Sequence, residues 1–417
     1  MIMIKTDSKL IDEILTRSVA AVYPSRDALK AKLTSGQQLR VYMGIDPTAD
    51  YIHLGHSTNY FMLERLHALG HKIIVLVGDF TAMIGDPSDK TSARKQLTSD
   101  DVKRNMVTFK EQIGHILDFS SPANPIEFKY NSEWLGKLDF EMLAELASQF
   151  TVQQMIERDA FKKRLGERKP LYVHEFFYPL MQGYDSVAMD VDLEIGGTDQ
   201  TFNMLAGRTL VTRYKHHDKF VIASTLLENP LTGEKLMSKS LGTGISLKED
   251  AVNMFGKIMA FPDQAIVQLY IDCTRVPMPA IDGLREQLAA GANPFDAKFS
   301  LATEIVTIYH GADAALTAAD GWKRQFRDKA QPTDIVEQGI SISGTMKIDN
   351  PDYYRNLYIS ALVETGLAGS RNKAVALFEQ NGVKLNGQPL SLSDKITIKD
   401  GDILQVGKLN FVKLKLT

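Results

Sequence analysis

Cysteine is almost absent from this sequence, because Cys273 is the only one among 417 residues. A single cysteine excludes an internal disulfide framework and a metal site built from several thiolates. Long apolar runs are absent too, and none approaches the roughly 18 residues that a membrane-spanning helix needs. The segment from Met1 to Ser8 lacks the basic, apolar and small-residue succession of a secretion signal. We therefore expect a cytoplasmic protein with no membrane partner.

The net charge is small as well. A formal charge of −3 argues against a protein that coats nucleic acid along its whole length. The charge is unevenly distributed, because residues 371–417 contain eight Lys or Arg and four Asp or Glu. This local positive surplus favours a separate module with an anionic partner, although a small domain can differ by a few charges without one.

Four apolar runs alternate with stretches of helical periodicity, which is the pattern of βαβ units. Parallel strands in such units end at one edge of the sheet, and ligands bind there. We therefore predict an α/β fold with a parallel sheet and a ligand site at the carboxyl ends of its strands. The predicted strands are 39–45, 72–79, 190–195 and 220–224, and the predicted helices occupy 8–35 (with a break at Pro24), 138–165 (two helices), 171–186 and most of 247–325.

The C-terminal part of the chain differs in composition and periodicity. Residues 326–355 are polar, turn-rich and poorly periodic, which predicts a linker. After residue 356 come two helical stretches and then short strands with turns at Asn386-Gly387 and Asp400-Gly401. The predicted organisation is a sheet domain at 1–230, a helical domain at 231–325, the linker, and a small α+β domain at 356–417.

A pair of histidines stands where the first predicted strand gives way to a helix. His53 and His56 are three positions apart, so on a helix they project from one face. A helix N-terminus favours phosphate, and Gly55 lets a nucleotide approach the backbone. The same spacing also occurs in metal pairs and surface pairs, but no third ligand follows at zinc-enzyme spacing. The position after Gly44-x-Asp46 favours the phosphate interpretation.

A basic loop forms the second candidate motif. Leu236-Met237-Ser238-Lys239-Ser240 is bracketed by Gly233 and Gly242. A lysine on a glycine-hinged loop can close over a polyphosphate and neutralise the charge that develops there. Considered alone, the segment is better interpreted as a solvated basic loop.

Together these two motifs resemble the HIGH and KMSKS signatures of class I aminoacyl-tRNA synthetases. The strings Tyr42–Asp50, Tyr178–Asp185 and Gly196–Gln200 resemble tyrosyl-tRNA synthetases. The resemblance runs from about residue 39 to 245, and the tail at 356–417 resembles the S4 RNA-binding domain of bacterial members. It implies a Rossmann-like catalytic domain, the KMSKS-loop subgroup and a homodimer, for which the apolar stretch Trp134–Phe150 is the candidate surface.

The resemblance also assigns roles to individual residues. Tyr42 and Asp185 would hydrogen-bond the phenol of the substrate tyrosine, and a buried pair of this kind rejects phenylalanine because the pair would be left without a hydrogen-bonding partner. The implied tyrosine-binding residues are Tyr42, Asp86, Tyr178, Gln182, Asp185 and Gln200. The implied ATP-binding residues are Gly44, Asp46, His53, Gly55, His56, Gly197, Asp199, Met237, Ser238 and Lys239. The implied catalytic residues are Thr48, His53, His56, Lys239 and Lys235.

The loop departs from the family pattern at one position. The family's first loop lysine would fall at Leu236, and a lysine stands one place earlier, at Lys235. Either Lys235 takes that role through a shifted loop, or Lys239 alone serves the nucleotide. We give Lys239 more weight.

The implied reaction is tyrosine–tRNA ligation. The tyrosine carboxylate, ionised at neutral pH, attacks the α-phosphorus of ATP, and pyrophosphate leaves. The tyrosyl group of the resulting adenylate is then transferred to the 3′ end of tRNA(Tyr). Mg²⁺ would accompany the ATP phosphates without a dedicated protein metal site. The alternatives are the tryptophan enzyme, against which Tyr42 with Asp185 argues, and a non-catalytic RNA-binding relative, against which His53, His56 and Lys239 argue.

The tail supplies candidate RNA contacts. Arg371, Lys373, Lys384 and Lys395 could present cations to a phosphate backbone, and few aromatic residues are available to stack on bases. The other interpretation is a small domain that only packs on its neighbour.

Overall fold

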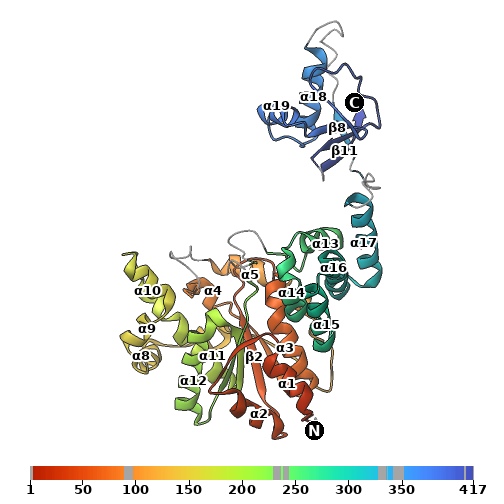
Figure 1. Ribbon diagram of the computed structural model, residues 1–417. Coiled ribbons are helices and arrows are strands. Elements are labelled where there is room, and N and C mark those ends of the chain that lie inside the picture. Colours follow the sequence, from red (N-terminus) through yellow and green to blue (C-terminus); the bar gives the residue numbers. More distant parts are fainter. Residues whose placement is uncertain are drawn as a thin grey trace. The chain divides into compact units, whose positions relative to one another are not determined.

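The computed structural model describes residues 3–88, 97–228, 236–237, 244–326, 335, 337–340, 352–407 and 410–416, apart from the side chains of Asp159 and Phe326. The chain divides into two compact units, Met1–Ala319 and Asp320–Thr417. Figure 1 shows the sheet and helices of each unit. No helix among the described residues is long and apolar enough to cross a bilayer.

A six-stranded sheet with the order β1-β6-β5-β2-β3-β4 is the centre of the first unit. All neighbouring strands pair in parallel except β1, which runs antiparallel to β6. β3 is an almost unbroken apolar run, as expected for a parallel strand covered on both faces. The predicted α/β fold is therefore confirmed, with an antiparallel edge strand in addition. The strands are β1 (Val19–Tyr23), β2 (Arg40–Ile45), β3 (Lys72–Val77), β4 (Glu127–Tyr130), β5 (Leu193–Gly197) and β6 (Phe220–Ser224).

The helices that follow β2 and β5 cover opposite faces of this sheet. The chain passes from β2 to β3 in one direction along the sheet and from β5 to β6 in the other. Because both crossovers are right-handed, α3 (Ser57–Ala68) and α12 (Thr201–Lys215) lie on opposite faces, and α11 (Tyr178–Met189) packs along α12. The crevice between β2 and β5, where the direction changes, is where ligands bind in such sheets.

The helical stretch predicted over residues 8–35 is confirmed in part: two helices are present, but a strand lies between them, before the predicted break at Pro24. The segment forms α1 (Ser8–Thr16), then β1, then α2 (Arg26–Thr34). Ser18 has a positive φ of 60°, which ends the helical path, and β1 pairs with β6 through Ala21 and Ala223. Pairing with a distant strand therefore overrides the helical propensity of the alanines in this segment.

Residues 138–165 contain three helices and not the two predicted. The side chains of Asp139 and Thr151 each cap the start of a new helix by accepting a hydrogen bond from the backbone N–H three residues later. These two caps divide the segment. The helices are α8 (Phe140–Ser148), α9 (Val152–Ile156) and α10 (Asp159–Gly166). The other short elements of this region are α4 (Thr81–Ile84), α5 (Ser99–Met106), α6 (Phe109–Gly114), α7 (Ser132–Leu135), and the 3-10 turns η1 (Leu54–His56), η2 (Val173–Phe176) and η3 (Thr198–Gln200).

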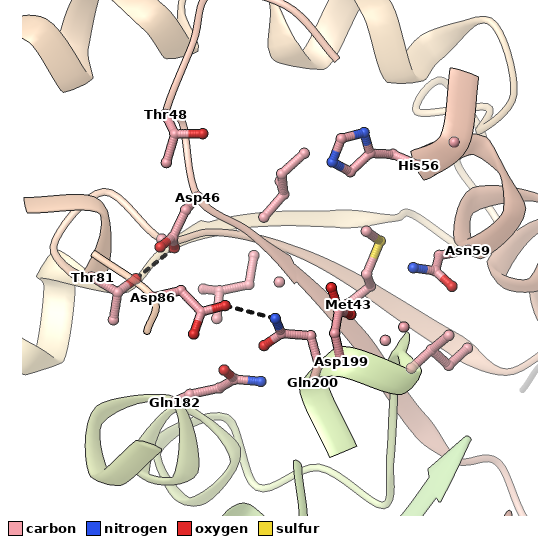
Figure 2. Close-up of a pocket in the computed structure, with 18 of the residues that line it drawn as sticks. Met43, Asp46, Thr48, His56, Asn59, Thr81, Asp86, Gln182, Asp199 and Gln200 are labelled. Atoms are coloured by element: carbon pink, nitrogen blue, oxygen red, sulfur yellow. Dashed lines mark hydrogen bonds between the residues drawn. The ribbon is translucent and has the colours of Figure 1, made fainter. Parts of the chain in front are cut away.

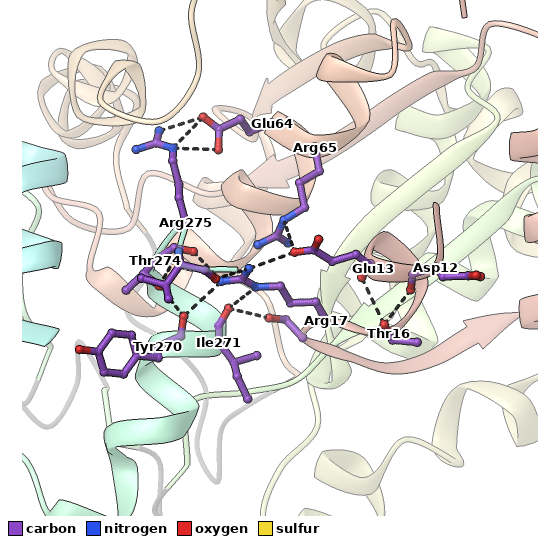
Figure 3. Close-up of polar contacts among 12 residues, drawn as sticks. Asp12, Glu13, Thr16, Arg17, Glu64, Arg65, Tyr270, Ile271, Thr274 and Arg275 are labelled. Carbon is purple, nitrogen blue, oxygen red and sulfur yellow. Dashed lines mark hydrogen bonds and ion pairs between the residues drawn. The ribbon is translucent and has the colours of Figure 1, made fainter. Parts of the chain in front are cut away.

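The helical region predicted after residue 247 is present. Arg17, at the end of α1, connects this region to the rest of the first unit. Its buried guanidinium donates to backbone carbonyls at and beyond the C-terminus of α14, where a helix leaves its last carbonyls without backbone partners (Figure 3). The acceptors are the backbone oxygens of Tyr270, Ile271, Thr274 and Val276, at 2.7–3.2 Å. The helices are α13 (Ala251–Met259), α14 (Ile266–Cys273), α15 (Met278–Ala289), α16 (Pro294–His310) and α17 (Ala312–Phe326), with the 3-10 turn η4 (Asp263–Ala265).

The second unit is a small α+β fold with its own core. Its sheet has the order β7-β11-β10-β8-β9, and its buried residues, from Ile340 to Leu414, form a separate hydrophobic cluster. Asn386 and Gly387 both have positive φ, as a tight hairpin turn requires. The predicted linker contains β7. The elements are β7 (Glu337–Ile340), α18 (Tyr353–Glu364), α19 (Arg371–Glu379), β8 (Val383–Leu385), β9 (Gln388–Pro389), β10 (Ile403–Val406) and β11 (Asn410–Leu416).

Candidate active site

A cavity of about 820 Å³ opens at the carboxyl ends of β2, β3 and β5, where the sheet topology predicts a ligand site. Figure 2 shows polar side chains that point into it from several elements. It brings together most of the residues singled out from the sequence. Those in its wall are Tyr42, Gly44, Asp46, Thr48, His53, Gly55, His56, Asp86, Tyr178, Gln182, Asp185, Gly197, Asp199, Gln200 and Met237.

One end of the cavity holds two buried oxygen-bearing side chains. The Tyr42 hydroxyl lies 2.9 Å from Ser186 Oγ. The Asp185 carboxylate accepts hydrogen bonds from Trp134 Nε1 at 2.7 Å and from Asn131 Nδ2 at 3.2 Å. Tyr42 and Asp185 are almost completely buried. This end can therefore hydrogen-bond a phenolic hydroxyl at a buried position.

Burial dominates the acid–base properties of these two groups. It raises the pKa of Tyr42 well above its usual value, and the negative charges of Glu194 and Asp185 raise it further. Burial also raises the pKa of Asp185, while the N–H donors Trp134 and Asn131 favour its ionised form. Tyr42 therefore stays a neutral hydroxyl, able to donate as well as accept.

Trp134 is the first residue of the stretch expected to form a dimer surface, and that expectation stays a prediction. The Trp134 ring packs against the cluster of Tyr42, Ile74 and Met189, and its indole N–H points at Asp185. Trp134 therefore belongs to the wall behind the cavity. Within the same stretch, Phe140 on α8 is 85% exposed.

The middle of the cavity is lined by amide and carboxylate groups. Gln200 Nε2 donates to Asp86 Oδ2 at 2.7 Å, and Gln182 lies on the same side of the cavity (Figure 2). Tyr178 donates its hydroxyl to Asp46 Oδ2 at 2.9 Å. Tyr178, Gln182 and Asp185 all face the cavity from α11, as their i, i+4 and i+7 spacing predicts. Several acceptor oxygens thus gather where a cationic group could be held.

Asp46 is held in place by its neighbours. Thr81 Oγ1 donates to Asp46 Oδ1 at 2.8 Å, opposite the bond from Tyr178. Gly78 makes this possible, because a Cβ at that position would lie 2.0 Å from Asp46 Oδ1. Asp79, just after β3, fixes the start of α7, since its carboxylate accepts from the backbone N–H and hydroxyl of Ser132.

The histidine pair lines the same cavity. The rings of His53 and His56 are 3.8 Å apart between centroids. His53 precedes the turn η1 in extended conformation, and α3 begins one residue after His56. Leu54 N donates to Ile245 O and Leu247 N donates to Ile52 O, both at 2.8 Å, so residues 244–247 run beside the histidine segment. Among the described residues, no group of three His, Cys, Asp or Glu could hold a metal ion.

Lys235, Ser238 and Lys239 lie outside the described residues, so their roles stay predictions. The residues that border this loop reach the cavity: Met237 is buried in its wall, and Leu236 N donates to Leu227 O at 2.9 Å. The loop sequence is therefore connected to the cavity by described residues.

Sequence reasoning missed the polar groups beneath the cavity. Glu194, in β5, and Lys219, directly before β6, form a fully buried ion pair. Asn131 and Ser186 were missed as partners of Asp185 and Tyr42. One signal was available: Glu194 interrupts an otherwise apolar run, and an acidic residue is rarely buried unless it is paired.

The candidate RNA contacts lie in the second unit. Arg371 and Lys373 are exposed on α19, Lys395 is exposed in a loop, and Lys384 is half-buried in β8. Arg371 donates to Asn356 Oδ1 at 2.8 Å and Ser360 Oγ at 3.2 Å, so part of its hydrogen-bonding capacity is used within the unit. Their role stays a prediction.

Comparison with known proteins supplies a family. Residues 34–327 match the family described as tRNA synthetases class I (W and Y). The chain is 42% identical to tyrosine–tRNA ligase 2 of Clostridium acetobutylicum, covering 97% of this chain and 99% of the relative. It is 39% identical to the tyrosine–tRNA ligase of Haemophilus influenzae, covering 99% and 98%.

Solved structures agree on the fold. A C-terminally truncated mitochondrial tyrosyl-tRNA synthetase of Aspergillus nidulans superposes with a TM-score of 0.66 at 22% identity, over 76% of this chain and 94% of that one. The tyrosyl-tRNA synthetase of Archaeoglobus fulgidus, solved with L-tyrosine, gives a TM-score of 0.60 at 21% identity, over 75% and 100%. From the family match and the near-complete coverage of its relatives, the chain belongs to the tyrosyl-tRNA synthetases of class I.

Proposed function

We propose that the cavity binds L-tyrosine and ATP side by side, joins them as tyrosyl-adenylate, and then delivers the tyrosyl group to tRNA(Tyr). The observation that carries the proposal is the set of groups that line one cavity. These are two buried oxygen-bearing side chains, several acceptors for a cation, and two histidines. Membership in the family makes the chain an enzyme that aminoacylates tRNA with tyrosine.

In the first step the substrate carboxylate attacks the α-phosphorus of ATP, and pyrophosphate leaves. The carboxylate is already ionised at neutral pH, so the protein needs no general base. Its contribution is to hold the two reactants in line and to stabilise the charge on the transferring phosphoryl group. We assign the phosphate end to Thr48, His53, His56 and Lys239, and the ribose to Asp199.

At the tyrosine end, we assign the phenol to Tyr42 and Asp185. The ammonium group would lie among Asp86, Tyr178 and Gln182, and Gln200 would approach the carboxylate. Mg²⁺ would enter with ATP, bound through its phosphates and waters, which is the usual mode for this ion.

In the second step a ribose hydroxyl at the 3′ end of tRNA(Tyr) attacks the tyrosyl-adenylate, and AMP leaves. We assign a share of tRNA binding to the second unit, whose sequence carries a surplus of positive charge. We further propose a homodimer that uses the exposed apolar residues Phe140 and Val152, which are 85% and 64% exposed. The site of action would be the cytoplasm, where tRNA and ATP are present.

Amino-acid-dependent exchange of pyrophosphate into ATP tests the first step. Exchange is expected with tyrosine and not with tryptophan or phenylalanine. Exchange with tryptophan would move the chain to the other branch of the family, and no exchange with any amino acid would contradict the proposal. Light scattering of the purified protein tests the dimer, and a monomer at all concentrations would refute it.

A further inference from the structure

The floor of the cavity contains an ion pair that the proposed reaction does not use. Glu194 and Lys219 are 2% and 0% exposed, and Lys219 Nζ contacts Glu194 Oε2. Lys219 also donates to Met204 O at 3.1 Å. Burial lowers the pKa of Lys219, and the attraction of Glu194 opposes this change. Removing two charges from water costs desolvation energy that offsets their attraction, so a contribution to stability does not by itself explain the pair.

The helix that packs above the pair leaves room for it. Gly207, on α12, has no side chain where one would collide with the network. A Cβ there would lie 2.5 Å from Lys219 Nζ and 2.8 Å from Ser186 Oγ. Any larger residue would push the ammonium away from Glu194, so the pair depends on this close approach of the helix backbone.

Glu194 connects the pair to the cavity. Gln182 Nε2 donates to Glu194 Oε1 at 3.0 Å. An ionised carboxylate only accepts hydrogen bonds, so it selects the orientation of the Gln182 amide in which the nitrogen faces Glu194. The amide oxygen is then left for the cavity. Lys219 keeps Glu194 in this accepting form by providing the positive charge that a buried carboxylate requires.

We propose that Glu194, neutralised by Lys219, is a positioning residue that makes Gln182 an acceptor for the ammonium group of the amino-acid substrate. This inference rests on the proposed function, because it deepens the role of the tyrosine end of the cavity. Without Glu194, the amide is free to turn its NH₂ group toward the ammonium, where donor would face donor. Ser186 Oγ also approaches Glu194, but at the longer distance of 3.4 Å.

Steady-state pyrophosphate exchange with Glu194→Gln is the first test. The variant keeps the size of the side chain but allows either orientation of Gln182, and it leaves Lys219 without a negative partner. We expect the KM for L-tyrosine to rise about tenfold or more, the loss associated with a hydrogen bond to a charged group. The KM for ATP should stay within about twofold of the wild type.

A ligand without an ammonium group separates positioning from general damage. 3-(4-Hydroxyphenyl)propionate retains the phenol and the carboxylate of tyrosine, and its inhibition constant against L-tyrosine should change less than about twofold in Glu194→Gln. In a Gln182→Ala background, Glu194→Gln should add less than about twofold to the KM for L-tyrosine, since its effect passes through Gln182. Equal weakening of both ligands, or additive effects of the two substitutions, would overturn the proposal.

Two further variants complete the design. Glu194→Asp keeps a negative charge opposite Lys219 and withdraws the carboxylate from Gln182, so this folded variant should also show a raised KM for L-tyrosine, and an unchanged KM would overturn the proposal. Glu127→Gln is the matched control, because Glu127 pairs with Lys72 at the edge of the same sheet while partly exposed to solvent. It should leave both KM values unchanged. Failure of the proposed function would appear differently, as loss of tyrosine-dependent exchange in the wild-type protein.

Discussion

Asp185 is held by two N–H donors that come from a distant part of the chain. Asn131 and Trp134 lie 54 and 51 positions earlier in the sequence, yet both donate to its carboxylate. They fix the carboxylate in the deep end of the cavity and favour its ionised form, which is the form that accepts a hydrogen bond from a phenol. The acceptor is therefore organised before any ligand arrives.

Asp185→Ala should remove the preference for tyrosine over phenylalanine. The substitution deletes the acceptor for the phenolic hydroxyl, and we expect kcat/KM for tyrosine to fall by about 100-fold, with a much smaller change for phenylalanine. Pyrophosphate exchange with each amino acid measures both values, and circular dichroism verifies the fold. A variant that retains the normal ratio of the two would show that Asp185 does not recognise the phenol.

Lys239→Ala should affect the chemical step more than binding. A lysine that meets charge developing on the transferring phosphate contributes mainly in the transition state, so adenylate formation should slow by about 100-fold. The equilibrium dissociation constant for tyrosine, measured by fluorescence titration, should change by less than about twofold. Equal losses in both quantities would remove the assigned role. Lys235→Ala is the informative partner variant, because it decides which of the two lysines serves the nucleotide.

Residue spacing grouped the site residues that share one element, and the family resemblance added site residues from other elements, but neither reached the buried ion pair. Tyr178, Gln182 and Asp185 could be grouped because the period of a single helix brings them to one face. Glu194 and Lys219 could not, since their contact depends on the parallel pairing of β5 with β6, in which Leu193 stands opposite Phe220. The pairing register belongs to the folded sheet and cannot be derived from the sequence of either strand alone.

At the scale of elements, the strands with continuous apolar runs were the most predictable. β2, β3 and β6 lie within a residue or two of the predicted ranges, because burial on both faces leaves a strong signal. The edge strand β1 and the short β4 were not predicted. β1 is half-exposed and rich in alanine, so its strand conformation depends on its partner β6. Weakly apolar edge strands carry too little local information to identify themselves.

Arg17→Met should destabilise the first unit without touching the cavity. The buried guanidinium satisfies four backbone carbonyls at and beyond the end of α14 and pairs with Glu13. Removing it takes a charged donor from each of these buried acceptors, although Tyr270 O still accepts from Thr274 Oγ1. We expect a loss of about 3 kcal/mol in the free energy of unfolding.

Urea denaturation followed by circular dichroism measures this loss. Arg285→Met is the control, since its exposed ion pair with Asp282 should contribute no more than about 0.5 kcal/mol. A similar effect of the two substitutions would contradict the role given to Arg17.

At the scale of the whole molecule, the chain consists of two units with separate cores. Among the described residues, those that line the cavity all belong to the first unit, and the cluster between Ile340 and Leu414 belongs to the second. The boundary of the second unit was not evident from the sequence, because β7 stands in a polar, turn-rich segment and becomes a strand by pairing in parallel with β11. A four-residue strand of this kind is stabilised by its neighbour and leaves little local pattern.

Deleting residues 337–417 removes β7 together with the rest of its sheet. We expect the deletion to spare the first step of the reaction and to impair the second. Tyrosine-dependent pyrophosphate exchange should stay within about twofold of the full chain, because no cavity residue is removed. Charging of tRNA(Tyr) should fall in kcat/KM by about tenfold or more and become less sensitive to salt, since phosphate contacts would be lost. Charging that is unaffected by the deletion would contradict an RNA-binding role for the second unit.

The backbone hydrogen bonds between the histidine segment and residues 244–247 mean that these distant positions influence where the His53 imidazole lies. A methyl group added at Gly244 would lie 3.2 Å from His53 Cβ, and Ser246 faces His53 directly in a single antiparallel bridge. The position of the His53 ring can therefore be changed without altering its neighbours in sequence. Small substitutions at residues 244 to 246 would act on the ring from the adjacent segment, and a library confined to these positions would keep both histidines.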